Sequence, residues 1–367
     1  MGDDEFIHQT LRQRVRFGRG QAAQHVFEEV RSHDSQRVMV IATKRAQDQA
    51  LQVTSLIDVS VQWDEVTQHV PAKLAVRATM AAREAGIDLI VSIGGGSTTG
   101  LAKAIALDTA IPIIAVPTTY SGSEATNMWG MTEDDTKNTG LDDRVLPTAV
   151  IYDADLVATL PMDLTVASAL NAMAHCIDSL WAPNADPINQ VNALEGARAL
   201  AHALRRMHAD PEDLAARGEA FYGCYLAAVA FASAGSGLHH KICHVLGGTF
   251  NLSHAQTHAI MLPHILAFNQ PAVPELAKRL SQALTGDSSD QPHGDRSALA
   301  ALLELYDQLS APRTLGELGF TAPDIPEAVS RTLKVSPASN PRPTTESNLT
   351  QLLTNALNGR FSSIEDS

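Results

Sequence analysis

Residues 88–103 read DLIVSIGGGSTTGLAK, an apolar run followed by three glycines, several hydroxyl residues and the start of an Ala-rich stretch. The pattern predicts a β-strand, a tight loop and an α-helix in succession. Glycines let a phosphate approach the backbone, and a helix N-terminus offers free N–H groups at its positive end. We therefore predict a pyrophosphate site formed by Gly94, Gly95, Gly96, Ser97 and Thr98. The alternative is a plain turn that needs glycine only for its backbone angles.

The chain around this loop alternates short β-branched runs with helical stretches, from residue 15 to about residue 153. Strands are expected at 38–42, 56–61, 88–93, 111–116 and 149–152, with an amphipathic helix at 70–85. Such alternation is typical of βαβ units in a parallel sheet. We therefore expect residues 1–157 to form an α/β dinucleotide-binding domain. Because the glycine loop does not follow the first strand, it differs from the usual Gly-x-Gly-x-x-Gly arrangement.

The second half of the chain has a different pattern. After residue 161 the β-branched runs give way to long segments rich in Ala and Leu. We therefore expect residues 158–367 to form an all-helical substrate and catalytic domain. Breaks between its helices are expected at Pro187, Pro211, Pro263, Pro271 and Pro274.

Composition limits the classes of partner. The 367 residues carry a formal net charge of −14, which argues against a general binder of nucleic acid or anionic membranes. The three cysteines have no paired spacing, and residues 1–13 lack the features of a secretory signal. The longest apolar run, at 224–235, is shorter than the roughly 18 residues of a membrane span. We expect a cytoplasmic protein without a nucleic-acid or membrane partner.

A second polar loop, PTTYSGSEAT at 117–126, follows the strand expected at 111–116. It should lie at the carboxyl edge of the same sheet, where open α/β folds bind ligands. The hydroxyl groups of Thr118, Thr119 and Ser121 are candidates for hydrogen bonds to phosphate, ribose or carboxamide. Tyr120 is a candidate for a contact with substrate or for packing over the cofactor. A turn capped by Ser and Thr explains the loop equally well.

Histidines in the helical half indicate the chemistry. Asn171 and His175 lie four residues apart on one expected helix, and His240 and His244 lie four apart on another, with His254 ten residues further on. A spacing of four places both side chains on one helix face, so these groups can converge on a cleft. Histidines that satisfy a helical core are the alternative. Further histidines enlarge the group: His239, His258 and His264.

A zinc or iron site is one interpretation of these histidines, since three imidazoles and a water form a catalytic zinc site. The position paired with His175 is Asn171, whose amide oxygen is a weaker, uncharged ligand. The nearest acid is Asp178, seven residues further along the chain. We therefore expect weak affinity for a metal.

These stretches together resemble the iron-containing alcohol dehydrogenase superfamily, and within it the maleylacetate reductase branch most closely. The resemblance implies an α/β dinucleotide-binding domain followed by an all-α domain, in the dehydroquinate synthase-like fold. It also implies a cleft for cofactor and substrate between the domains, and a homodimer. The matching stretches are FGRG at 17–20, IGGGSTTGLAKAIAL at 93–107, VPTTYSGSEAT at 116–126, LPTAVIYDADL at 146–156, LNAMAHCID at 170–178, LHHKICHVLGGTFNLSHAQTHA at 238–259 and LPHILAFNQPAVPE at 262–275.

The resemblance also implies roles for single residues. One Asp and three His bind the metal in metal-dependent members, and the matching positions here are Asn171, His175, His240 and His254. Members of the maleylacetate reductase branch are described as needing no metal, so we expect no essential metal here. His244 matches a residue near the nicotinamide and the reacting carbonyl.

The activity implied is reduction of maleylacetate, a dicarboxylate, to 3-oxoadipate in the catabolism of aromatic compounds, with NADH or NADPH as cofactor. Thr43, followed by Lys44 and Arg45, stands where many NAD-preferring relatives have an acid, so NADPH should be tolerated. Both cations could instead be solvated at the start of a helix. Candidates for substrate contact are Asn171, Lys241 and Arg144.

Hydride addition to the conjugated double bond would place negative charge on an enolate oxygen, which needs hydrogen-bond donors in place of a Lewis acid. Imidazole titrates near neutral pH, so histidines are candidates both for these donors and for the protonating acid. The four candidates are His175, His240, His244 and His254.

Two other functions fit parts of the pattern. A metal-dependent alcohol or aldehyde oxidoreductase of the same superfamily would use three of the histidines as ligands. A non-catalytic nucleotide sensor would need the glycine loop but not the polar groups of the helical half.

Overall fold

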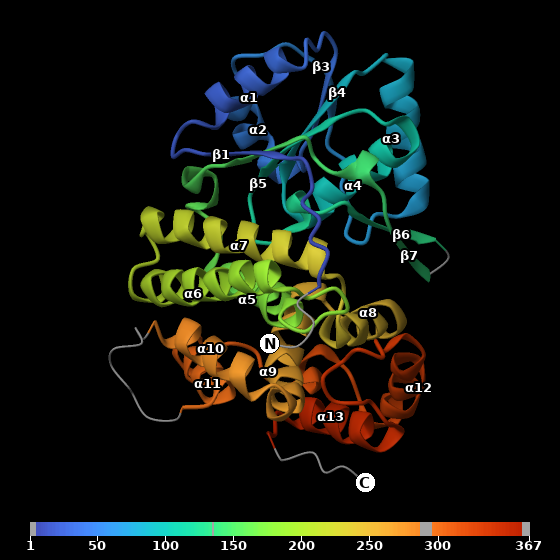
Figure 1. Cartoon of the computed structure of the whole chain (residues 1–367). Helices are drawn as coiled ribbons and strands as arrows, with labels where there is room; N and C mark the ends of the chain where they lie inside the picture. Colours follow the sequence, from blue (N-terminus) through green and yellow to red (C-terminus); the bar gives the residue numbers. More distant parts are fainter. Residues whose placement is uncertain (1–4, 134–135, 287–295, 362–367) are drawn as a thin grey trace. The chain divides into compact units, whose positions relative to one another are not determined.

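A computed structural model describes residues 5–133, 136–286 and 296–361 of the chain. These residues form two compact units, drawn in Figure 1. The first unit comprises residues 11–161, and the second comprises 162–361 together with the N-terminal residues 5–10. The sequence-based boundary at 157/158 falls within the short helix and turn that close the first unit, just before α5.

The first unit contains a six-stranded sheet in which every pairing is parallel. The strand order is β1-β8-β5-β4-β2-β3. The two buried central strands, β4 and β5, are rich in Ile and Val because helices cover both faces of the sheet. The strands are β1 (Arg14–Phe17), β2 (Val38–Ile41), β3 (Val59–Trp63), β4 (Leu89–Gly94), β5 (Ile113–Pro117) and β8 (Ala149–Tyr152).

Helices α1 (Ala22–Ser32) and α2 (Gln47–Val53) pack on one face of this sheet, while α3 (Ala72–Glu84) and α4 (Gly96–Thr109) pack on the other. Figure 1 shows the two pairs on opposite sides of the strands. The helix after β2 and the helix after β4 therefore leave the sheet toward opposite faces. The carboxyl ends of β2 and β4 therefore border a crevice of the kind in which open α/β sheets bind ligands.

The parallel α/β architecture confirms the expected fold class, and three details differ. The third strand starts at Val59 rather than at residue 56. The edge strand β1 was not predicted, because its sequence RVRF is short and carries two arginines that bind Glu29 on α1. An antiparallel hairpin of β6 (Met128–Glu133) and β7 (Thr136–Leu141) was also missed, because neither segment alternates apolar and polar residues.

The second unit is all-helical in its described residues, as expected. Its α-helices are α5 (Met162–Ser179), α6 (Pro187–Ala209), α7 (Leu214–Ala234), α8 (Leu238–Phe250), α9 (His254–Asn269), α10 (Pro274–Thr285), α11 (Ala298–Leu309), α12 (Ile325–Val335) and α13 (Glu346–Asn358). Short 3₁₀ segments join elements in both units: η1 (Lys44–Ala46), η2 (Ser123–Ala125), η3 (Asp143–Val145), η4 (Ala154–Val157), η5 (Gln270–Ala272), η6 (Leu315–Leu318) and η7 (Ala322–Asp324).

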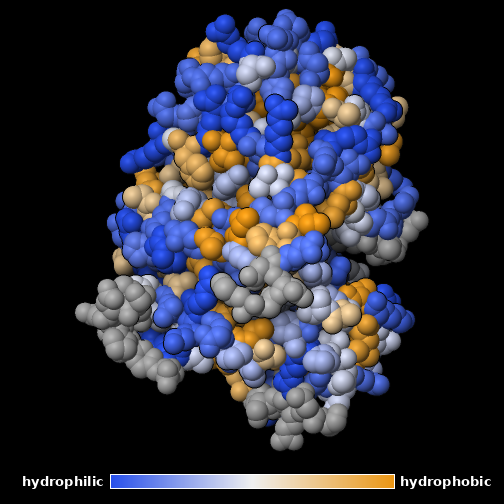
Figure 2. Space-filling view, in the orientation of Figure 1, coloured by the Kyte–Doolittle hydropathy of each residue, from blue (hydrophilic) through white to orange (hydrophobic). Residues whose placement is uncertain are grey.

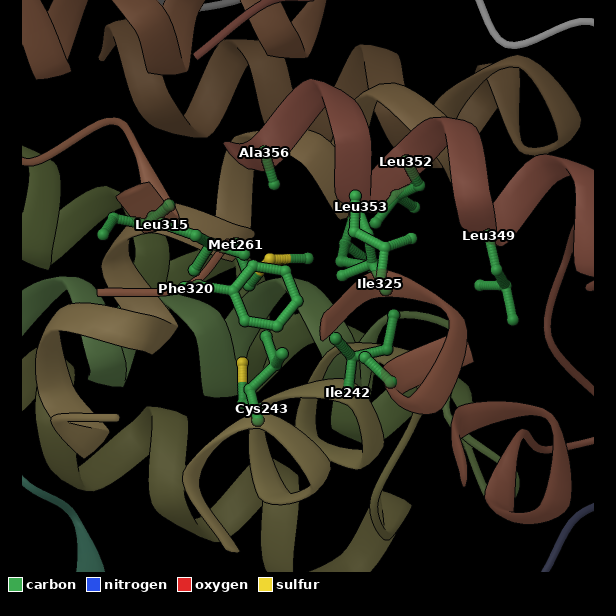
Figure 3. Packing of buried hydrophobic residues seen from close by; sticks show 14 of the residues in the cluster. Ile242, Cys243, Met261, Leu315, Phe320, Ile325, Leu349, Leu352, Leu353 and Ala356 are labelled. Atoms are coloured by element: carbon green, nitrogen blue, oxygen red, sulfur yellow. The ribbon is translucent and has the colours of Figure 1, made fainter. Parts of the chain in front are cut away.

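The small residues of the second unit allow close helix packing. Helices α6 and α7 approach so closely at Gly196 and Gly223 that a Cβ atom on Gly223 would lie 3.0 Å from the carbonyl oxygen of Gly196. Side chains of α8, α9, α12 and α13 build a second apolar core, shown in Figure 3, in which Phe320 packs among Ile242, Met261 and Leu353. This core supports the two helices that carry most of the histidines.

One expected helix break is wrong. Pro263 lies inside α9 and does not end the helix. A proline lacks the N–H that would bind the carbonyl four residues earlier, here that of Ala259. The hydroxyl of Tyr306 on α11 donates to this carbonyl oxygen at 2.5 Å. The tertiary contact therefore replaces the missing helical hydrogen bond.

Hydrophilic residues cover much of the face seen in Figure 2, in keeping with the charge of −14. Among the described residues, no single helix has both the length and the apolar character needed to span a membrane; α7 and α8, bent by 97°, meet the criteria only when joined.

Candidate active site

The glycine loop joins β4 to α4 in the first unit. Gly94, the last residue of β4, has a φ of +154°, and a Cβ atom there would overlap the side chain of Thr98. Helix α4 begins at Gly96 with Gly95 as its N-cap. Only glycine satisfies the backbone of Gly94, and the following helix presents its N-terminus at the carboxyl edge of the sheet. This is the geometry that the sequence predicted for a phosphate site.

The second loop lies directly beside the first, because β4 and β5 pair in parallel up to Gly94 and Pro117. The backbone N–H of Thr118 donates to the carbonyl oxygen of Gly94 at 3.0 Å. A Cβ atom on Gly95 would lie 3.0 Å from the side chain of Thr119, and one on Gly96 would lie 3.4 Å from Ser121 Oγ. The structure therefore brings the predicted cofactor residues of both loops together.

Thr43 follows the carboxyl end of β2. Because β2 pairs in parallel with β4, this end lies next to the end of β4 from which the glycine loop starts. Lys44 and Arg45 are exposed beside it. Thr43 and the glycine loop thus lie at the carboxyl ends of two neighbouring strands. In contrast, Tyr120 is fully buried, which favours packing over a contact with substrate.

The histidine cluster is built by α5, α8 and α9 of the second unit. The ring centroids of His175 and His240 lie 4.9 Å apart, those of His240 and His244 6.3 Å, and those of His244 and His254 6.2 Å. His175 and His240 are buried, whereas His244 is half-buried and His254 is exposed. The four histidines predicted from spacing therefore lie together, and His244 and His254 are the two more exposed members.

Asp178 orients this cluster from α5. Its carboxylate accepts hydrogen bonds from His240 Nδ1 at 2.7 Å, from the backbone N–H of Gly237 at 2.9 Å and from that of His239 at 3.3 Å. Burial raises the pKa of Asp178 to about 7, while hydrogen bonds from backbone N–H groups, those of His239 and Gly237 among them, oppose the rise. As a carboxylate, Asp178 holds the proton of His240 on Nδ1, so Nε2 of His240 presents a lone pair.

His239 and His258 also belong to the cluster, although neither was among the predicted catalytic residues. The ring of His258 lies 4.9 Å from that of His240 and 4.4 Å from that of His254. His239 Nε2 and His258 Nδ1 are 3.0 Å apart. Because a neutral imidazole has one donor and one acceptor nitrogen, either arrangement of this pair leaves one outer N–H buried without a partner among the described residues. Their sequence signal was the helical spacing of His254 and His258.

His264 does not belong to the cluster. It lies ten residues beyond His254 on α9, about 15 Å along the helix axis. Its ring stacks on that of Phe361 at 4.6 Å.

Burial keeps the inner histidines uncharged. Desolvation lowers the pKa of His175 to about 4 and that of His239 to about 3. It also holds the pKa values of His240 and His258 well below that of free histidine. Each of these four rings has a buried nitrogen without a hydrogen-bond partner among the described residues: His175 Nδ1, His239 Nδ1, His240 Nε2 and His258 Nε2. Such nitrogens favour a polar ligand in the cluster.

The residues at the positions of the family's metal ligands are a poor fit to an iron site. They supply one amide and three imidazoles, and no carboxylate. The carboxylate of Asp178 is bound to His240 Nδ1 and to the backbone N–H groups of Gly237 and His239, so it supports the ring of His240 and does not stand in for Asn171. The ligand atoms of His239, Cys243 and His258 lie within 4.8 Å of one another. A metal there would leave two buried imidazole N–H groups without acceptors and would need a thiolate, whereas burial raises the pKa of Cys243.

The three candidate substrate contacts lie in different surroundings. Asn171 is buried one turn before His175 on α5. Lys241 is half-exposed on α8. Arg144, in the first unit, is exposed, and its guanidinium donates to both carboxylate oxygens of Asp142, at 2.7 and 3.0 Å. Their contacts with substrate stay predictions.

Residues 12–154 match the family model described as iron-containing alcohol dehydrogenase, and residues 165–357 match the C-terminal model of the Fe-containing alcohol dehydrogenase family. A maleylacetate reductase from Sphingobium indicum is 43% identical over 97% of this chain and 98% of its own length.

Two solved structures show the same fold over nearly the full length of both chains. An iron-containing alcohol dehydrogenase from Corynebacterium glutamicum is 54% identical, with a TM-score of 0.92 and 97% of each chain covered. The maleylacetate reductase from Agrobacterium tumefaciens is 37% identical, with a TM-score of 0.89, over 98% of this chain and 99% of that one. The chain therefore belongs to the iron-containing alcohol dehydrogenase family, and within it to the maleylacetate reductases, which are oxidoreductases.

Proposed function

We propose that this chain reduces maleylacetate to 3-oxoadipate with NADH or NADPH, and that it needs no resident metal ion. A relative named maleylacetate reductase matches it over 97% of its length at 43% identity, which supports maleylacetate as the substrate. The two adjoining loops at the sheet edge support the cofactor, which supplies a hydride when bound.

The metal-free reaction is supported by one observation above all. The positions of the family's metal ligands hold Asn171 in place of an acid, and the carboxylate that contacts the described histidine cluster, that of Asp178, binds His240 Nδ1 and two backbone N–H groups. An uncharged donor set binds divalent iron weakly. The cluster must then stabilise the charge of the transition state through hydrogen bonds.

Roles within the cluster follow from exposure and from hydrogen bonding. His254 is exposed and His244 is half-buried, so these two can exchange protons with solvent and serve as the acid that protonates the reduced carbon. His240 Nε2 presents a lone pair and accepts a hydrogen bond from the substrate side or from a neighbouring imidazole. His175 stacks on Phe231 and His240, at 4.7 and 4.9 Å, and holds the rings in place.

Cofactor choice, assembly and location complete the proposal. Thr43 carries no negative charge that would repel a 2′-phosphate, so NADPH is accepted along with NADH. We further propose a homodimer in the cytoplasm, by analogy with the family, with no nucleic-acid or membrane partner.

The test follows oxidation of NADH and of NADPH with freshly prepared maleylacetate, before and after exhaustive chelation of the same sample. We expect turnover with both cofactors that survives chelation. Loss of activity that added zinc or iron restores would overturn the metal-free reaction and favour the metal-dependent alternative. No turnover with maleylacetate, despite binding of NADH, would overturn the proposal that maleylacetate is the substrate.

A further inference from the structure

A buried lysine links the helix of the glycine loop to the second loop. Lys103 lies on α4 two turns after Gly96, and 1% of its surface is exposed. Its Nζ donates to the carbonyl oxygens of Ser123 at 2.6 Å, Thr126 at 2.8 Å and Met128 at 2.8 Å. Thr126 Oγ1 lies at 3.1 Å. The three N–H donors of an ammonium group thus all have acceptors at the end of the second loop.

Apart from these carbonyl groups, only Glu124 among the described residues favours the charged form of Lys103. Burial lowers the pKa of Lys103 to about 7, and the carboxyl of Glu124 opposes that shift. Glu124 is fully buried and accepts a hydrogen bond from Tyr152 Oη at 2.9 Å, while burial raises its own pKa. An aliphatic side chain at position 103 would suit an apolar helix face better. The lysine is therefore explained by the carbonyl groups that it binds.

Both ends of the second loop are tied to the β4–α4 segment. At its start, the N–H of Thr118 binds the carbonyl oxygen of Gly94. At its end, Lys103 binds the backbone at Ser123, Thr126 and Met128. Between these ties lie Thr119 and Ser121, the side chains that approach Gly95 and Gly96.

We propose that Lys103 is a positioning residue for the dinucleotide: it holds the loop of residues 118–126 against the glycine loop, so that the hydroxyl groups of both loops face one phosphate-binding edge. The inference rests on the proposed cofactor. Loss of the Nζ atom frees the end of the loop and weakens cofactor binding, while the histidine cluster in the second unit stays unchanged.

The test compares Lys103→Met with Ile105→Ala in the full-length protein. Lys103→Met keeps the length of the side chain and removes its donors. Ile105, also on α4, is fully buried in the apolar core on one face of the sheet and has no side-chain hydrogen-bonding group, so its truncation reports the effect of lost packing. The dissociation constant of NADH is measured by fluorescence, together with Tm, KM for NADH and kcat.

We expect Lys103→Met to raise the dissociation constant and the KM for NADH at least tenfold with kcat at saturating NADH within about threefold. Ile105→Ala should lower Tm and leave NADH binding within twofold. NADH binding by Lys103→Met within twofold of the unaltered protein would overturn the inference, as would an equal loss in Ile105→Ala.

If Lys103→Met does not fold, Lys103→Gln, which retains an N–H donor on a shorter side chain, is measured in its place. A dissociation constant raised above that of the unaltered protein supports the inference, and an unchanged one overturns it. Absence of NADH binding by the unaltered protein would instead overturn the proposed cofactor and the inference with it.

Discussion

Asp178 Oδ2 lies 2.7 Å from Nδ1 of His240, and both side chains are buried on facing helices. The same carboxylate accepts from the backbone of Gly237 and His239, so it fixes the start of α8 as well as the tautomer of His240. A carboxylate that orients an imidazole controls which ring nitrogen faces the reacting groups.

We expect Asp178→Asn to lower kcat/KM for maleylacetate by about 10- to 100-fold, because the amide offers one acceptor oxygen where three donors converge. Asp186→Asn is the matched control. Asp186 is also buried, and its carboxylate caps α6 by accepting from the backbone N–H groups of Ile188 and Asn189. Both variants should lose stability, but only Asp178→Asn should lose activity in steady-state kinetics. Equal activity of the two at equal Tm would show that Asp178 has only a structural role.

Asn171→Asp should create a metal site. The change restores an anionic ligand one turn from His175, and carboxylates bind zinc and iron more tightly than amides do. We expect zinc affinity to rise at least about tenfold, or ~1.4 kcal/mol, in competition with a chromophoric chelator. The double variant Asn171→Asp/His240→Ala should not show this increase in zinc affinity. An unchanged affinity in Asn171→Asp would mean that the missing acid is not what limits metal binding.

Gly96→Ala should separate cofactor binding from folding. A Cβ atom at this helix position meets Ser121 Oγ at an ordinary contact of 3.4 Å, so the fold tolerates it. The same atom would occupy space that the proposed phosphate needs in order to reach the backbone. We expect the dissociation constant of NADH to rise about tenfold with Tm nearly unchanged. Gly248→Ala, on an exposed site of α8 with nothing within 4 Å, is the control and should bind NADH normally.

The stability of the protein should fall as the pH drops below about 6.5, in part through His264. Desolvation lowers the pKa of His264 to about 4 in the folded protein. Between pH 6.5 and 4 the unfolded chain therefore binds a proton that the folded chain does not, which costs up to about 1.4 kcal/mol per pH unit. His264→Asn should flatten this slope in denaturant titrations between pH 7 and 5. His208→Asn, at an exposed site on α6, should leave the slope as it is.

Several elements could be predicted because their signals are local. The run IVSIGGGSTTG contains the strand, the glycine that requires a positive φ and the start of the helix within eleven residues. The pairs Asn171/His175 and His240/His244 follow from helical spacing alone. The predicted helix break at Pro263 was wrong. The hydroxyl that binds the freed carbonyl of Ala259 comes from Tyr306, which lies 47 residues further along the chain.

The sequence by itself determined the α/β half, the helical half, the glycine loop between strand and helix and four of the clustered histidines, because strand alternation, helix periodicity and glycine geometry act over a few residues. The tertiary structure alone decided that Asp178 binds His240, that His239 pairs with His258 and that Lys103 ties two loops together. These contacts join residues 19 to 62 positions apart along the chain. Which of many buried polar groups meet depends on how the helices and strands pack, and no local pattern contains that information.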